Sequence, residues 1–192
     1  MYAHVIFIEL RKSITKEGAD LRLDIGEIFR IHRNEIYTYL IYFTGRTDVE
    51  DLVQETFIRA IKGIHGYRQL ASVKTWLYAI ARNVAIDEKR RKKLLITDVE
   101  LDNLPLNGYS LEQRVETRET TYRILNLLGA VNHKYRDVLI LRGIHELSSQ
   151  EAADILGWTP VRVNVTYHRA LKTARKLIVI DIEGEEEHDA IQ

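Results

Sequence analysis

The sequence predicts an all-α protein built from two small helical domains joined by a linker. Apolar residues recur at helical spacing along most of the chain. Residues typical of helix starts and stops stand between these runs. An alternating strand pattern competes only in the first ten residues. With 192 residues and 45% hydrophobic content, the chain is long enough to bury two modest cores.

Residues 24–93 predict the N-terminal domain, of three to four helices. One helical face of its first helix carries Ile25, Ile28, Phe29, His32, Ile36, Leu40 and Phe43. Gly45 follows as a stop signal, and Thr47 with Glu50 forms a capping-box pattern that predicts the start of a second helix. The second helix buries Leu52, Val53, Phe57, Ala60, Ile61 and Ile64, and Gly63 and Gly66 loosen its end.

A third helix is predicted to begin after Ser72, whose hydroxyl can cap it. Three residues at helical spacing, Trp76, Ile80 and Val84, form its expected buried stripe. Leu77 and Ala81 flank this stripe. Residues 94–121 then predict a linker, because they hold Pro105, an Asn107-Gly108 turn and six acids against two bases.

Residues 122–180 predict a C-terminal helix-turn-helix domain. Ser148 and Glu151 form a capping box, and Gly157 ends that helix. Thr159 caps the last helix, with Pro160 at its first position, where a missing N–H costs nothing. A capped short helix, a glycine turn and a second amphipathic helix are the spacing of a helix-turn-helix.

The formal net charge is zero because separated blocks cancel. Residues 82–93 hold six bases against two acids, and residues 160–180 hold five bases and no acid. Residues 181–192 form an acidic tail with six acids and no Lys or Arg, which we expect to be disordered. A nucleic-acid partner is therefore compatible with overall neutrality.

Several function classes find no support in the sequence. The chain has no cysteine, its seven histidines show no metal-ligand spacing, and it lacks a phosphate-binding glycine loop. We expect no enzyme, no cofactor and no metal site. The apolar run at residues 5–8 is too short to span a membrane, and no basic segment precedes it. No membrane insertion and a cytoplasmic location are expected.

The polar face of the second helix is the first candidate site. Its members are Asp48, Glu50, Asp51, Gln54 and Glu55. Acids near a helix N-terminus are favourable in themselves, so for this helix taken alone a solvated face is the favoured explanation and a protein partner is the alternative.

The second candidate site lies on the following loop and third helix. It mixes aromatic and basic side chains. Its members are Tyr67, Arg68, Ser72, Lys74, Arg82, Lys89 and Arg90, and Trp76 and Tyr78 lie among them in the sequence. Aromatic rings stack on unpaired nucleobases, and Lys and Arg side chains neutralise phosphates, so this mixture suits single-stranded DNA. Trp76 and Tyr67 could equally be core residues.

The third candidate site is the face of the last helix turned away from its buried stripe of Val163, Tyr167, Ala170, Ala174 and Leu177. Its members are Arg162, Asn164, Val165, His168, Arg169 and Lys172. Arg and Asn can read purine edges in the major groove and Val can touch a thymine methyl, although an ordinary bundle helix is the simpler alternative.

Four segments together resemble the extracytoplasmic-function group of bacterial sigma factors: DVEDLVQETF at 48–57, TWLYAIARN at 75–83, ELSSQEAADILG at 146–157 and YHRAL at 167–171. The likeness spans residues 25–178. It implies that residues 48–55 dock on the clamp helices of RNA polymerase core. The loop 67–74 would capture a flipped base of the minus-ten promoter element, and the helix 160–176 would read the minus-thirty-five element. Its domain would also touch the polymerase flap.

The resemblance also implies an anti-sigma partner, often membrane-bound, a role in a stress or envelope response, and weak free promoter binding because polymerase opens and orients the two domains. Asn164 and Val165 depart from relatives, which often have a basic residue there, so the promoter sequence does not transfer. Two alternatives remain: a stand-alone helix-turn-helix regulator, and an interaction protein that binds polymerase without initiating transcription.

Residues 1–23 lie outside the resemblance. Residues 16–19 can be encoded by a purine-rich stretch that resembles a bacterial ribosome-binding site. Leu21 follows this stretch at a suitable distance and could be encoded by a UUG start codon. This suggests a mature protein beginning at Leu21. The competing expectation is that residues 2–10 pack as an additional strand or helix.

Overall fold

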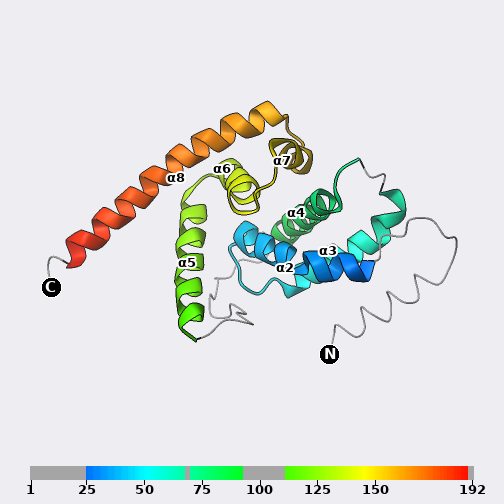
Figure 1. The fold of residues 1–192 in the computed structure, drawn as a ribbon, viewed down its shortest axis with the longest axis horizontal. Coiled ribbons are helices and arrows are strands. Elements are labelled where there is room, and N and C mark those ends of the chain that lie inside the picture. The colour runs from blue at the N-terminus through cyan, green and yellow to red at the C-terminus, as the bar shows by residue number, and fades with distance from the viewer. Residues whose placement is uncertain (1–24, 68–69, 93–110, 190–192) are drawn as a thin grey trace.

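The computed structural model describes residues 25–67, 70–92 and 111–189, and every regular element within them is helical (Figure 1). In chain order these elements are α2 (Ile25–Thr44), α3 (Glu50–Gly63), the 3-10 turn η1 (Ile64–Gly66), α4 (Val73–Lys92), α5 (Leu111–Ala130), α6 (His133–Val138), the π-helical segment η2 (Leu139–Ile144), α7 (Ser149–Leu156) and α8 (Pro160–Asp189). The predicted all-α class is confirmed. The proposals on residues 1–23, on Pro105 and on the Asn107-Gly108 turn lie outside the described residues.

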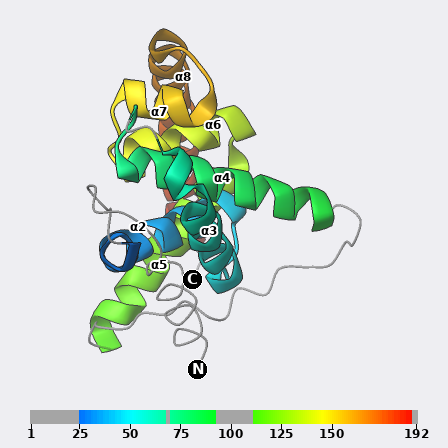
Figure 2. The same ribbon diagram turned by 90° about the vertical axis from the view of Figure 1, so that its right-hand side faces the viewer.

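Helices α2, α3 and α4 pack against one another and form the N-terminal domain (Figure 2). Gly45 ends α2 with a positive φ of 72°, a conformation that glycine adopts without strain. Ser72 caps α4 as predicted, accepting a hydrogen bond from the backbone N–H of Thr75 at 3.1 Å. The proposed Thr47 capping box is wrong. Val49 precedes α3 without a side-chain cap, and Thr47 is buried two residues upstream, where its carbonyl accepts the Tyr37 hydroxyl.

The buried stripe predicted for α4 is confirmed only in part, because Val84 and the flanking Leu77 and Ala81 are buried whereas Trp76 and Ile80 are not. Trp76 and Ile80 are only half-buried at its edge. The fully buried positions are Leu77, Tyr78, Ala81, Val84 and Ala85. Tyr78 had been grouped with the DNA-facing aromatics, but it is 0% exposed. The reason is tertiary: α4 is covered on two sides, by α2 and α3 and by α7, so a single amphipathic stripe does not describe it.

The C-terminal domain contains α5 to α8. Helix α5 begins at Leu111, so the expected linker is helical over its last eleven residues, 111–121. Ser148 and Glu151 form the predicted capping box, and Gly157 ends α7 with a φ of 66°. Thr159 accepts the backbone N–H of Arg162 at 3.2 Å, which confirms it as the cap of α8.

Helix α8 continues to Asp189, so the expectation of a disordered acidic tail is wrong for residues 181–189. No proline interrupts this segment, and its glutamates are good helix formers that extend the preceding helix. In Figure 1, α8 projects well beyond the other helices of its domain.

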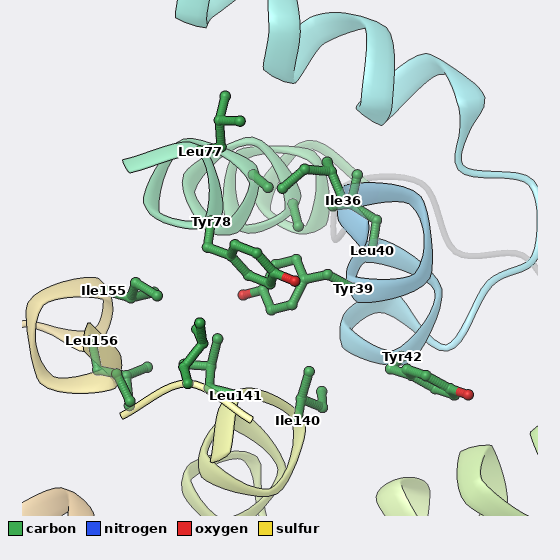
Figure 3. Packing of buried hydrophobic residues seen from close by; sticks show 14 of the residues in the cluster. Ile36, Tyr39, Leu40, Tyr42, Leu77, Tyr78, Ile140, Leu141, Ile155 and Leu156 are labelled. Atoms are coloured by element: carbon green, nitrogen blue, oxygen red, sulfur yellow. The ribbon is translucent and has the colours of Figure 1, made fainter. Parts of the chain in front are cut away.

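The buried residues of the two domains form one continuous hydrophobic cluster. Figure 3 shows the rings of Tyr39 and Tyr78 between the N-terminal helices and the side chains of Leu141, Ile155 and Leu156. We call this contact of α2 and α4 with the end of α6, η2 and α7 the closed interface. It places the C-terminal domain directly on α4, the helix that carries most of the second candidate site.

Candidate protein-binding and nucleic-acid interfaces

The acidic candidate site lies at the start of α3. Asp48, Glu50 and Asp51 are exposed, whereas Gln54 and Glu55 are half-buried. Arg46 holds Asp48 in place, with its Nε 3.0 Å from Oδ1 of the carboxylate. Asp48 precedes α3 and its carboxylate is bound by Arg46, whereas the other four predicted residues lie on the first two turns of the helix, where the Glu50 and Asp51 side chains are exposed.

A second arginine joins α3 to α4. Nε of Arg59 donates to Glu55 at 2.8 Å, and its Nη1 donates to Asp87 at 2.7 Å. These bonds, first with Asp87 and then with Glu55, raise the pKa of Arg59, and the bond from Arg59 lowers the pKa of Asp87. Arg59, Asp87 and Asp51 line a shallow hollow of about 650 Å³ between the two helices. Asp87 and Arg59 thus extend and order the acidic surface.

The described residues at the two ends of the loop before α4 are held by hydrogen bonds. The Tyr67 hydroxyl donates to the carbonyl of Ala71, and its ring lies 4.9 Å from that of Trp76. The Ser72 hydroxyl is used in capping α4. The predicted contact Arg68 lies outside the described residues. Tyr67 is therefore half-buried rather than freely presented.

The basic members of the second candidate site divide into two groups. Lys74 pairs with Glu35 at 2.9 Å, and Arg82 pairs with Asp137 of the C-terminal domain at 2.9 Å. Lys89 and Arg90, farther along α4, are exposed. The structure brings these residues onto one helix but presents only the second pair to solvent.

Three polar pairs cross the closed interface. Besides Arg82–Asp137, Tyr78 shares a hydrogen bond of 2.8 Å with Nδ1 of His145, and Thr75 donates to Glu151 at 3.3 Å. Burial raises the pKa of Asp137 even though Arg82 opposes it. Burial, with Lys74 nearby, lowers the pKa of His145 to about 4 against the opposing effect of Glu35. Burial of the Arg82–Asp137 ion pair thus costs desolvation energy, and His145 is neutral in the interface.

The third candidate site is the first part of α8, residues 160–176, called the recognition helix below. All six predicted residues are exposed: Arg162, Asn164, Val165, His168, Arg169 and Lys172. Two of them are held by neighbours. The guanidinium of Arg162 lies 4.1 Å from the centre of the Trp158 ring, and Asn164 accepts a hydrogen bond from Ser149 at 2.6 Å.

Sequence reasoning missed the residues that act through others. Arg59, Asp137, His145 and Ser149 fell outside every predicted site. Their partners stand up to 67 positions away in the chain, and no local pattern links such pairs. A charged residue within an apolar run, such as Asp137 before the sequence VLIL, is the one signal that could have suggested a buried ion pair.

Within the part of the chain that the structure describes, no group of three His, Asp or Glu residues is arranged to hold a metal ion. No helix among the described residues is long and apolar enough to cross a membrane.

Comparison with known proteins matches two family models to this chain. Sigma-70 region 2 matches residues 28–94, and Sigma-70, region 4 matches residues 122–173. RNA polymerase sigma factor YlaC of Bacillus subtilis is 34% identical over 159 residues, covering 81% of this chain and 92% of that protein. The ECF RNA polymerase sigma factor SigM of the same organism is 31% identical and covers 81% and 95%.

Two solved structures share the fold. CnrH, in complex with the cytosolic domain of CnrY, has a TM-score of 0.64 at 22% identity and covers 91% of this chain and 97% of that one. The sigma factor RpoE of Bartonella quintana, in complex with the anti-sigma factor NepR, has a TM-score of 0.67 at 21% identity and covers 82% and 98%. With region 2 and region 4 in the expected order and relatives matched over most of their length, this chain belongs to the extracytoplasmic-function group of RNA polymerase sigma factors.

Proposed function

We propose that this protein binds RNA polymerase core and directs promoter recognition, DNA melting and transcription initiation, without an enzymatic activity of its own. One observation carries the proposal: the chain presents two exposed surfaces of opposite character on separate domains. The start of α3 is acidic, whereas the recognition helix exposes three Lys or Arg side chains among the predicted contacts and carries no acid. An acidic surface suits a basic protein partner and a basic helix suits duplex DNA.

In this proposal the acidic surface docks on the clamp helices of polymerase. Asp48, Glu50 and Asp51 are the exposed contacts, and Gln54 and Glu55 complete the surface at its half-buried edge. The bond from Arg59 fixes the Glu55 carboxylate, so the partner meets an ordered surface. The C-terminal domain in turn contacts the flap.

The opened strand of the minus-ten element is assigned to α4 and the loop before it. Lys89 and Arg90 are exposed and suit phosphates, while Tyr67, Arg68 and Ser72 are the loop residues proposed to meet a flipped base. Lys74 and Arg82 reach this strand only after leaving Glu35 and Asp137. Because Asp137 belongs to the C-terminal domain, the closed interface must open before Arg82 contacts DNA.

The duplex of the minus-thirty-five element is assigned to the recognition helix. Arg169 and Lys172 are exposed and lie at least one helical turn beyond Arg162 and Asn164. We propose phosphate or base contacts for them, with Arg162, Asn164, Val165 and His168 nearer the N-terminal end of the helix, where recognition helices usually contact base edges.

An anti-sigma factor is a proposed third partner, because both structural neighbours are described in complex with such an inhibitor or with a cytosolic domain. A cytoplasmic location and control by a stress or envelope signal are proposed with it. Such a partner would stabilise a form in which α4 is covered, as it is here by α7.

Asp51→Arg tests the polymerase surface. Asp51 is exposed and lines the hollow between α3 and α4, so reversing its charge should leave the fold intact. We expect affinity for core polymerase to fall about tenfold or more, since opposed charges across an interface become like charges. Binding to immobilised core polymerase measures this, with circular dichroism as the check on folding. Unchanged affinity would contradict the assignment.

Arg169→Ala tests the duplex surface independently. The side chain is exposed on the recognition helix, and its loss should weaken binding to promoter duplex about tenfold while core binding stays at the wild-type level. Footprinting of the polymerase complex on promoter DNA measures the effect. Equal loss of helicity in this variant and in Asp51→Arg would refute the separation of the two surfaces.

A further inference from the structure

A hydrogen bond between the two helices of the helix-turn-helix fixes the orientation of a predicted base-reading residue. Ser149 is the first residue of α7, and its hydroxyl donates to Oδ1 of Asn164 in α8 at 2.6 Å. A side-chain amide has an acceptor oxygen at one end and two donor hydrogens on nitrogen at the other. Because Ser149 holds the oxygen toward α7, Asn164 offers its NH₂ group to a ligand as a hydrogen-bond donor.

Exposed apolar side chains flank this donor. Val161 is 72% exposed and Val165 is 46% exposed. Val161 lies three positions before Asn164, and side chains at this spacing are neighbours on a helix surface. Helical side chains also lean toward the N-terminus, which inclines Asn164 toward Val161. The surface therefore combines one donor with two adjacent methyl-bearing groups.

Of the four bases, thymine has the complementary major-groove edge. Thymine presents the O4 acceptor next to its C5 methyl, whereas guanine presents acceptors without a methyl. Cytosine presents an amino donor, which the fixed NH₂ group of Asn164 does not match, and adenine presents the N7 acceptor beside an amino donor and without a methyl group. An unrestrained asparagine would instead pair with adenine through both ends of its amide.

We propose that Ser149 is a positioning residue that orients Asn164 as a donor, so that this position of the recognition helix selects thymine, with its methyl group against Val161 and Val165. The inference rests on the proposed function, because it assumes that the recognition helix enters the major groove of promoter DNA. It adds which base the helix selects and which residue outside the helix determines that choice.

The first stage of the test locates the base. Polymerase core carrying the full-length protein is used to select duplexes from a library randomised over the upstream promoter element. The selection is repeated with Asn164→Ala. The position whose base preference disappears in the variant is the one read by Asn164, and we expect the wild-type preference there to be thymine.

The second stage replaces that thymine with two analogues in the selected duplex. Deoxyuridine lacks the methyl group, and its expected penalty in affinity is about fourfold. The analogue 5-methyl-dC, paired with dG, keeps the methyl group but presents an amino donor instead of O4. Its expected penalty is about tenfold.

Variants of α7 then separate positioning from a structural role. In Ser149→Ala the amide is free to turn its oxygen outward, so the penalty for 5-methyl-dC should shrink roughly threefold while the deoxyuridine penalty stays the same. Ser149→Thr keeps the hydroxyl and should restore discrimination. Gln150→Ala is the matched control, because Gln150 is an exposed neighbour that hydrogen-bonds Asp154 within α7.

The outcomes are distinguishable. A selected element in which Asn164 reads a base other than thymine, or a 5-methyl-dC penalty that is the same in wild type and Ser149→Ala, would overturn this inference and leave the proposed function intact. A selection that returns no shared sequence from the polymerase complex would contradict the proposed function, and this inference with it.

Discussion

Asp137→Ala is expected to open the closed interface and expose α4. Asp137 is buried and forms an ion pair with Arg82, whose side chain is 22% exposed to solvent. Removing one member of a buried ion pair typically costs roughly 3–5 kcal/mol, because the remaining charge stays buried without its partner. Since Arg82 is partly exposed, we expect the closed form to lose about 2 kcal/mol relative to the open form.

Small-angle scattering and single-strand binding measure this opening. The variant should show a larger radius of gyration and bind a minus-ten single strand more tightly than wild type, because Arg82 becomes available to phosphates. Asp154→Ala is the control, since Asp154 is an exposed acid of the same domain that bonds Gln150 within its own helix. Identical scattering and strand affinity in wild type and Asp137→Ala would refute the interpretation of the closed interface as a cover on α4.

Acidification is expected to weaken the same interface through His145. Burial lowers the pKa of this imidazole to about 4, whereas an exposed histidine titrates near 6.5. A lowered pKa means that the open form binds the proton more readily. Stability of the closed form is therefore complete above about pH 6.5 and falls progressively as the pH decreases toward 4.

Scattering at a series of pH values between 7 and 5 measures this effect, a range chosen to lie above the pKa values of most carboxylates. His145 faces Tyr39, Tyr78, Lys74 and Glu35. Asp137 acts in the opposite sense, because burial raises its pKa and the closed form binds that proton more readily. His145→Gln, which keeps a hydrogen-bonding group for Tyr78 but does not titrate, should remove the pH-dependent opening. A variant that opens with acid exactly as wild type does would assign the effect to other groups.

Local features of the fold could be predicted from the sequence because their causes are local. The Ser72 cap, the box of Ser148 and Glu151, and the Gly157 terminus each depend on residues within one helical turn. The capping box predicted at Thr47 is wrong although its sequence pattern is equally good. The hydroxyl of Tyr37, ten positions earlier, donates a hydrogen bond to the Thr47 carbonyl, and the helix begins later. A capping motif competes with tertiary contacts that a short window of sequence does not contain.

The exposed site residues were placed more reliably than the covered ones. Those on the acidic surface and the recognition helix lie on polar faces whose periodicity is read directly, and the structure exposes them or leaves them half-buried. Arg82 and Tyr78 were assigned to DNA because a basic and an aromatic residue near a basic run suggest it. Their partners, Asp137 and His145, lie 55 and 67 positions away, and only the docking of the two domains brings them together.

Transcription with sigma-free bacterial core polymerase tests whether this protein initiates transcription as a sigma factor. The purified protein is added to core polymerase with a library of genomic promoters, and the transcripts are sequenced. We expect specific start sites that share two spaced upstream elements, and we expect Asp51→Arg and Arg169→Ala both to reduce transcription from them. No specific transcripts, together with tight duplex binding by the protein alone, would contradict this expectation and identify a stand-alone regulator instead.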